Sequence, residues 1–363
     1  MRKIVCVSFL SALLFCGCSD SNKSSIFIPK VKEQDYAHQA RPKIVPTKLD
    51  YCPMGVNDVV SIGKYLIFTT NDASGYIRIY DIDKDTEVAS ILKKGRAANE
   101  LTAGRPYNLS EQVYSSDGDI MFPVIDNTTL KEINITQSIK EGVAVINAST
   151  PCLFLHDGNT VLIDNDISKT FIFQKAKMHD GECDAPEFYV QQAGGEKKII
   201  PVHKRVMPDG DGVNVEVDVE LYAQYMGSVF KHPKKNIIVH SLQNMNYLIF
   251  FDLDNDKCFA VHQKGERTYD DKVEYVPEHM VFGDAAVSED YIFINYRYNI
   301  TAGGESDKEC EVLAFDWSGN YVGGFVSDAT LHRLTYNEEC KSLFCVSIND
   351  ETLYQIPIKD FLK

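Results

Sequence analysis

Two runs of alternating aspartates have the residue type and spacing that come nearest to a metal site in this chain. Each run starts like the loop of a calcium-binding helix–loop–helix motif, with aspartate at positions one, three and five: Asp81, Asp83, Asp85 and Asp252, Asp254, Asp256. Such a loop needs glycine at position six and glutamate at position twelve. The chain has Thr86 or Lys257 at position six and Leu92 or Gln263 at position twelve. We therefore interpret these aspartates as turn residues that cap their own backbone, and we predict no metal or cofactor.

The motifs that mark common catalytic sites are absent from the sequence. It contains no Gly-x-Ser-x-Gly elbow, no His-Glu-x-x-His zinc motif and no phosphate-binding loop. Its nine histidines are scattered, and none has a carboxylate or a second histidine at metal-ligand spacing. A site assembled from distant parts of the chain remains an alternative, although the sequence identifies no nucleophile or general base.

The elements that must position any such site are short strands, because the apolar stretches beyond Pro42 are short and bounded by Asn, Asp or Gly. One pattern recurs six times: a polar or turn residue, three or four apolar-rich positions, then Asn or Asp. Its copies are 64–68, 119–122, 160–163, 236–239, 291–294 and 342–345.

A second strand follows each copy and keeps in step with it. These second strands are 76–81, 129–134, 170–174, 247–252, 312–316 and 352–357. Units recur about every 55 residues, close to the spacing of propeller blades with generous loops. The sequence therefore predicts an all-β fold, a six-bladed β-propeller over residues 42–363. The longest interruption, between 175 and 230, is interpreted as an enlarged strand or excursion of blade three or four.

The last unit ends too close to the C-terminus to contain an outer fourth strand. An open outer edge would leave unpaired backbone donors and acceptors. The segment 43–49 precedes the first unit and has no partner of its own, and its Pro46 is tolerable on an outer strand. We predict that 43–49 pairs beside 353–358, so that the N- and C-terminal strands close the ring.

The first residues have the properties of a bacterial lipoprotein signal peptide. Arg2 and Lys3 precede an apolar run of 12 residues (4–15), too short for a membrane span, which needs about 20. Gly17-Cys18 resembles a lipobox junction, although Phe15 stands where leucine is preferred. We predict a signal peptide at 1–17, lipid attachment at Cys18 and a polar tether over 18–41. An ordinary signal peptide with unmodified cysteines is the alternative.

The balance of charge is acidic, with 52 Asp and Glu residues against 37 Lys and Arg and a net charge of −15. Removal of residues 1–17, which contain Arg2 and Lys3 but no acidic residue, lowers the net charge to −17. Such a surface repels phosphate backbones, so we expect no nucleic-acid partner. The seven cysteines beyond Cys18 are dispersed and odd in number, which favours buried thiols; Cys340 and Cys345 could still meet across a hairpin.

Two passages of the first unit resemble the TolB-like six-bladed β-propeller family of bacterial envelope lipoproteins. They are 79–81 (Ile-Tyr-Asp) and 94–101 (Lys-Gly-Arg-Ala-Ala-Asn-Glu-Leu). The second is similar to the family's Gly-Arg-Gly-Pro-Gly-Glu-aromatic signature at Gly95, Arg96 and Glu100, whereas 97–99 replaces the Gly-Pro-Gly centre. The resemblance implies a six-bladed propeller and no assigned chemistry.

In a propeller, the loops between the second and third strands of the blades gather on one face. The candidate binding face consists of the polar residues in those loops: Asp72, Asp126, Asp164, Asn244, Tyr296, Arg297, Tyr298 and Asp350. Most are also ordinary turn residues. Tyr296, Arg297 and Tyr298 exceed what a turn requires; they could stack on a sugar or anchor a peptide, or the tyrosines could face the neighbouring blade.

Two functions follow as hypotheses. The first is a non-enzymatic binding or scaffold module for a protein, peptide or glycan. It would be anchored to a membrane of the bacterial cell envelope, at the outer membrane on its periplasmic or surface side. The alternative is a metal-dependent propeller hydrolase or lactonase with its site in the central channel.

Overall fold

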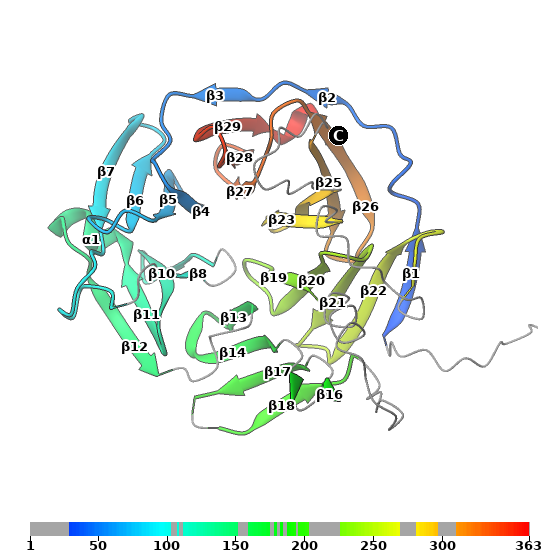
Figure 1. The fold of residues 1–363 in the computed structure, drawn as a ribbon, viewed down its shortest axis with the longest axis horizontal. Helices are drawn as coiled ribbons and strands as arrows, with labels where there is room; N and C mark the ends of the chain where they lie inside the picture. Colours follow the sequence, from blue (N-terminus) through cyan, green and yellow to red (C-terminus); the bar gives the residue numbers. More distant parts are fainter. Residues whose placement is uncertain are drawn as a thin grey trace, which may run out of the picture.

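The computed structural model describes residues 29–102, 107–108, 112–151, 159–174, 178–179, 182–183, 187–193, 195–202, 226–268, 281–296 and 310–362. Six sheets of four or five strands surround a central axis (Figure 1). The helical elements in these residues are α1 (Ile135–Glu141) and the 3-10 turn η1 (Ile358–Asp360). The predicted all-β fold, a six-bladed propeller, is confirmed. No helix among the described residues is long and apolar enough to cross a membrane.

Blades 1 to 3 follow the chain in order. From the axis outward, blade 1 consists of β4 (Val56–Ile62), β5 (Tyr65–Thr70), β6 (Ile77–Asp81) and β7 (Thr86–Ile91). Blade 2 consists of β8 (Tyr107–Asn108) and β9 (Tyr114–Ser116), which share the inner position, then β10 (Asp119–Asp126), β11 (Thr129–Asn134) and β12 (Ile146–Pro151). Blade 3 consists of β13 (Asn159–Ile163), β14 (Asp166–Gln174), β17 (Glu187–Gln192) and β18 (Lys197–Ile200), with the hairpin β15 (Met178–His179)–β16 (Glu182–Cys183) between its second and third strands.

Blades 4 to 6 each borrow a strand from the N-terminal part of the chain. In the same order, blade 4 consists of β19 (Gly227–Lys231), β20 (Ile237–Leu242), β21 (Tyr247–Asp252), β22 (Lys257–Gln263) and the borrowed β1 (Lys30–Gln34). Blade 5 consists of β23 (Phe282–Val287), β24 (Tyr291–Tyr296), β25 (Cys310–Asp316), β26 (Tyr321–Ser327) and the borrowed β2 (Lys43–Ile44). Blade 6 consists of β27 (Arg333–Asn337), β28 (Ser342–Ser347), β29 (Thr352–Pro357) and the borrowed β3 (Thr47–Leu49).

Both predicted strand series are present, paired copy by copy as β5–β6, β10–β11, β13–β14, β20–β21, β24–β25 and β28–β29. Blade 3 differs from the prediction in position. Its β13 occupies the inner place of its sheet, where the other blades have a strand that precedes the recurring pattern. The recurring pattern therefore marks the second strand in five blades and the first strand in blade 3.

The alternating direction of the strands gives the propeller two different faces. Connections between second and third strands, and those from one blade to the next, emerge on one face, which we call the loop face. Connections between first and second strands, and between third and fourth strands, emerge on the opposite face, which we call the turn face.

The core consists of six apolar clusters among the described residues, one at each interface between neighbouring blades. Side chains alternate across a strand, so one strand serves two interfaces. In β21, Ile249 and Phe251 face blade 3, whereas Leu248 and Phe250 face blade 5. This two-sided burial explains why the recurring strands are nearly continuous apolar runs.

The ring closes as the sequence predicts. Strand β3 pairs antiparallel with β29, with Leu353 opposite Leu49, Tyr354 opposite Lys48 and Gln355 opposite Thr47. The first described part of the chain thereby supplies the outer strand of the last blade. Figure 1 shows this segment following the outer rim from β1 past β2 to β3.

The sequence predicts a polar tether over 18–41, but the chain is part of the propeller from Lys30 onward. Strand β1 pairs parallel with β22, and β2 pairs parallel with β26. We call residues 30–49 the strap, because they join the outer edges of blades 4, 5 and 6. The polar sequence of β1 is compatible with an outer strand, since only one edge of β1 is covered.

Tyr36 fastens the strap between blades 4 and 5. Its side chain is fully buried (0 % exposed) within the apolar cluster that these two blades share. Its ring lies edge-on to Phe315 at a centroid distance of 5.2 Å and to Tyr296 at 5.9 Å. Its hydroxyl donates to the backbone oxygen of Asn246 at 3.2 Å, and its backbone N–H donates to Gln263 Oε1 at 2.9 Å.

Arg41 fastens the strap a second time. Its guanidinium pairs with Glu311 at 2.7 Å, and its side chain is only 5 % exposed. The same group donates to the backbone oxygen of Tyr36 and lies 6.0 Å from the ring centroids of both Tyr296 and Tyr321.

Replacement of Tyr36 should therefore destabilise the whole propeller. Tyr36→Ala leaves a cavity between two blades and should lower the free energy of unfolding by about 3–5 kcal/mol. Tyr36→Phe keeps the ring and loses one hydrogen bond, so about 1 kcal/mol is expected. Val45→Ala, at a strap residue that is 82 % exposed, is the control and should change little. Urea unfolding measures all three, and equal midpoints for Tyr36→Ala and Val45→Ala would show that the strap is not fastened.

Candidate functional site

Three charged residues lie near the loop-face ends of neighbouring inner strands. They are Asp58 on β4, Asp284 on β23 and Arg333 on β27, from blades 1, 5 and 6. The pairing of β4 with β5 shifts register between Val56 and Asp58, and that of β23 with β24 shifts between Phe282 and Ala285. Such bulges re-aim side chains and are frequent beside functional sites.

Hydrogen bonds connect these three blades around the axis. Arg333 Nε donates to the backbone oxygen of Asn57 at 2.7 Å, across to the bulge of blade 1. The backbone N–H of Leu334 donates to Asp284 Oδ2 at 2.9 Å, across to the bulge of blade 5. The half-buried Arg333 guanidinium and Asp284 carboxylate are therefore held at fixed positions near the axis, at the loop-face ends of their strands.

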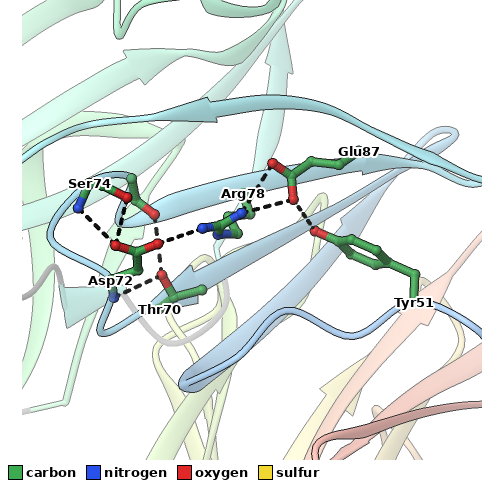
Figure 2. Close-up of polar contacts among 7 residues, drawn as sticks. Tyr51, Thr70, Asp72, Ser74, Arg78 and Glu87 are labelled. Carbon is green, nitrogen blue, oxygen red and sulfur yellow. Dashed lines mark hydrogen bonds and ion pairs between the residues drawn. The ribbon is translucent and has the colours of Figure 1, made fainter.

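A second charged group lies on the loop side of blade 1 (Figure 2). Arg78, on β6, bridges two carboxylates: Asp72 in the β5–β6 connection and Glu87 on β7, with 3.2 Å between Arg78 and Glu87. Tyr51, which follows the strap, donates its hydroxyl to Glu87 at 2.6 Å. We call Tyr51, Asp72, Arg78 and Glu87 the blade 1 network.

The network holds the β5–β6 connection in one conformation. Asp72 Oδ1 accepts from the backbone N–H of Ser74 at 2.9 Å and from its hydroxyl at 2.7 Å. Thr70 Oγ1 donates to the backbone oxygen of Gly75 at 3.2 Å and accepts from the backbone N–H of Asp72 at 3.3 Å. The Ser74 hydroxyl, with the Ser74 N–H and Arg78, lowers the pKa of Asp72 to about 2. Asp72 is therefore ionised at any physiological pH.

Two other candidate residues of the loop face have different surroundings. Asp126 is buried (4 % exposed), pairs with Lys131 at 2.8 Å and accepts from the Thr102 hydroxyl at 2.9 Å. It fastens the connection between blades 1 and 2 and is not available to a ligand. Asp350 is exposed in the β28–β29 turn, and Asn244 is half-buried in the β20–β21 connection.

Asp164 is placed elsewhere than the sequence predicts, whereas Tyr296 follows the alternative that it faces the neighbouring blade. Because β13 is an inner strand, Asp164 lies on the turn face, where it accepts from Asn236 at 2.7 Å and pairs with Lys169 at 2.7 Å. Tyr296 is 1 % exposed and packs against Tyr36 and Phe282, so it belongs to the core. The predicted residues Cys18, Arg297 and Tyr298 lie outside the described residues.

The turn aspartates behave as predicted from their motif. Asp81 Oδ1 accepts from the backbone N–H of Lys84 at 3.2 Å, and Asp252 Oδ1 accepts from that of Asn255 at 3.1 Å. No group of three or more His, Cys, Asp or Glu side chains in the described part of the chain could hold a metal ion. The described residues thus supply no ligand set for the metal-dependent alternative.

The segment that resembles the TolB-like signature forms a compact turn. Gly95 donates its N–H to the backbone oxygen of Leu101 at 2.9 Å, and Glu100 Oε2 accepts from the N–H of Ala97 at 2.8 Å. A Cβ at Gly95 would lie 1.8 Å from Glu100 Oε2. A side chain at position 95 would therefore displace the Glu100 carboxylate from Ala97, which gives the matched Gly95 and Glu100 a structural reason.

Comparison with known proteins supports the fold and little beyond it. A member of the DUF4221 family from Bacteroides vulgatus is similar at a TM-score of 0.52 and 15% identity, covering 87% of this chain and 96% of that one. The WD40 domain of Neurospora crassa Pan2 has a TM-score of 0.39 at 12% identity, with 81% and 73% covered. The Cps50 (Swd1) β-propeller domain of Myceliophteria thermophila has a TM-score of 0.41 at 10% identity, with 84% and 99% covered.

Family membership is not shown by these comparisons. No protein-family model matches the chain, and no curated protein matches it. The chain is therefore a six-bladed β-propeller with a bacterial structural neighbour from the DUF4221 family. The resemblance to the TolB-like family stays a prediction.

The Asp72 carboxyl provides a pH-dependent test of the blade 1 network. It should titrate near pH 2 in the folded protein, below the value of about 3.9 for an unfolded chain. Its stabilising effect is then complete above about pH 4 and is lost as the pH falls through about 2. Ser74→Ala removes the hydroxyl donor and should raise the midpoint, as measured by carboxyl ¹³C NMR.

Ser318→Ala, in a turn on the opposite face of blade 5, is the matched control and should leave the Asp72 midpoint unchanged. An identical Asp72 midpoint in the parent and in Ser74→Ala would contradict the role of Ser74.

Proposed function

We propose that this propeller is a lipid-anchored module of the bacterial cell envelope that binds a protein, peptide or glycan on its loop face and carries out no catalysis. The observation that carries the proposal is the difference between the two faces. Loop positions on a rigid scaffold commonly hold the binding residues of a protein.

Between strand ends on the loop face, five connections are long: 92–106, 175–186, 201–226, 264–281 and 297–309, which contain 15, 12, 26, 18 and 13 residues. On the turn face, the connection 135–145, with 11 residues and α1, is the longest, and every other one has two to five residues. Turns of two to five residues are near the minimum needed to reverse a strand. Chain length beyond this minimum is thus found mainly between strand ends on the loop face.

The loop face also has exposed groups suited to a polypeptide partner. Met54 and Ile348 are 76 % and 37 % exposed, in the connection that enters blade 1 and in the β28–β29 turn of blade 6. These two connections are joined by a hydrogen bond from the Gly55 N–H to Glu351 Oε1 at 3.2 Å. Apolar side chains beside the carboxylates of Asp350 and Glu351 form a mixed surface of the kind that binds peptides.

The blade 1 network and the bonds around Arg333 support a preformed binding surface. Both groups consist of charges that are already paired or hydrogen-bonded, which fixes loop geometry and lowers the ordering cost of association. These described parts of the loop face are therefore preformed, as a binding scaffold requires.

Site-specific photo-crosslinking in intact cells tests the binding face. A photoreactive amino acid replaces Asp350 on the loop face or, as the matched control, Asp290 on the turn face; both are exposed aspartates in short turns. We expect a discrete adduct from position 350 and none from position 290. Adducts of equal yield from both positions, or from position 290 alone, would contradict the proposal.

The lipid anchor needs a separate test, because it concerns Cys18 outside the described residues. Cys18→Ala should move the protein from the membrane fraction to the soluble fraction, whereas Cys340→Ala, at an exposed cysteine, should not. Detergent-phase partitioning measures both. Retention of Cys18→Ala in the detergent phase would overturn the anchor.

A further inference from the structure

We infer that the strap orients the propeller on its membrane, with the turn face toward the lipid surface and the loop face away from it. The inference rests on the proposed anchor at Cys18 and adds a direction to it. Three features carry it: the direction of β1, the fixed attachment of the strap, and the number of residues between the anchor and β1.

The direction of β1 follows from its parallel pairing with β22. As the fourth strand of blade 4, β22 runs from the turn face to the loop face. Lys30 lies opposite Phe259 and Gln34 opposite Gln263, so β1 starts near the turn-face end and finishes at the loop-face end. The described chain therefore begins at the rim of blade 4, near the turn-face end of β22.

The strap cannot swivel about this point, because β1 is bonded to two blades. The N–H of Lys264 in blade 4 donates to the backbone oxygen of Gln34 at 2.8 Å. Gln34 Oε1 accepts from the N–H of Tyr321 in blade 5 at 3.0 Å. Two residues further along, Tyr36 is buried between the same blades. The position and direction of β1 are thus properties of the folded propeller.

The anchor segment is short in comparison with the propeller. Eleven residues (19–29) separate Cys18 from Lys30. A flexible chain of that length spans about 18 Å, and on the order of 40 Å at full extension. Lys30 lies opposite Phe259, so to bring the loop face to the membrane the segment would have to double back along residues 259–263 of β22, which extend for about 17 Å. The turn-face orientation needs no such extension.

This orientation agrees with what each face offers. Apart from the connection 135–145 with α1, the turn face has short turns, which can lie near a lipid surface without losing a binding site. The loop face, with its long connections, then points away from the membrane and stays accessible to a partner.

Energy transfer to the membrane measures the orientation on the full, lipidated protein. One donor fluorophore is attached at Lys257→Cys, at the turn-face start of β22, or at Lys264→Cys, just beyond its loop-face end. Both lysines are exposed, so the two variants lose the same charge on the same edge. Acceptor lipids are placed in the outer leaflet of phosphatidylglycerol–phosphatidylethanolamine vesicles that carry the protein.

Labelling must be confined to the new cysteine. The background therefore contains Cys340→Ser, Cys152→Ser and Cys183→Ser. The neighbouring Cys258 stays, because burial raises the pKa of its thiol to about 12 and keeps it protonated and unreactive at neutral pH. Peptide mapping confirms the labelled position.

We expect the transfer efficiency from position 257 to exceed that from position 264 by roughly twofold or more, since the positions differ by about 23 Å along β22. Equal efficiencies, or a higher efficiency from position 264, would overturn the orientation. Protein that fails to float with the vesicles would instead overturn the lipid anchor, so the two failures are distinguishable.

A flexible insertion provides the second variant. Twenty Gly and Ser residues placed between Lys23 and Ser24 lengthen the anchor segment and leave β1 intact. The two transfer efficiencies should then converge. A difference that persists unchanged with the insertion would show that contacts of the propeller surface, and not the short segment, set the orientation.

Discussion

Pairing of β3 with β29 determines how the rest of the propeller is arranged, because it joins the two ends of the ring. Each apolar cluster lies between two blades, so an unjoined ring would expose the cluster between blades 6 and 1. The strap extends the closure to two further blades through β1 and β2. Tyr36 and Arg41 bury an aromatic ring and a paired guanidinium between blades 4 and 5, which makes the strap part of the core.

Much of this fold could be predicted from the sequence, and the exceptions have physical causes. The second and third strands of most blades are buried on both sides, so they are apolar runs that recur visibly. Inner strands escape prediction because β4 and β23 are interrupted by bulges and contain polar residues such as Asp58 and Asp284. Strand β1 also escapes prediction, because a strand with one covered edge can be as polar as a tether. Its attachment to the propeller depends on Tyr36, which follows the strand.

The candidate site is less predictable, because it depends on tertiary placement. The recurring pattern predicts that Asp164 lies on the loop face. In blade 3, however, the pattern marks the first strand and not the second, so Asp164 lies on the turn face. Tyr296 is buried in the cluster between blades 4 and 5, where it packs against Tyr36 of the strap and against Phe282. The blade 1 network has one local signal, the charged Arg78 between the buried Ile77 and Ile79, but its partners Tyr51 and Glu87 come from other segments.

The central claim is that the strap is a structural part of the propeller, and native-state hydrogen–deuterium exchange tests it most directly. Amides in strands that open only with the whole domain exchange far more slowly than those of an unattached segment. The hydrogen-bonded amides within residues 30–36 and 43–49 should therefore exchange as slowly as those of β22, β26 and β29, their pairing partners. Exchange of both strap peptides at the rate of an unstructured chain, while β22 and β29 remain protected, would contradict the account.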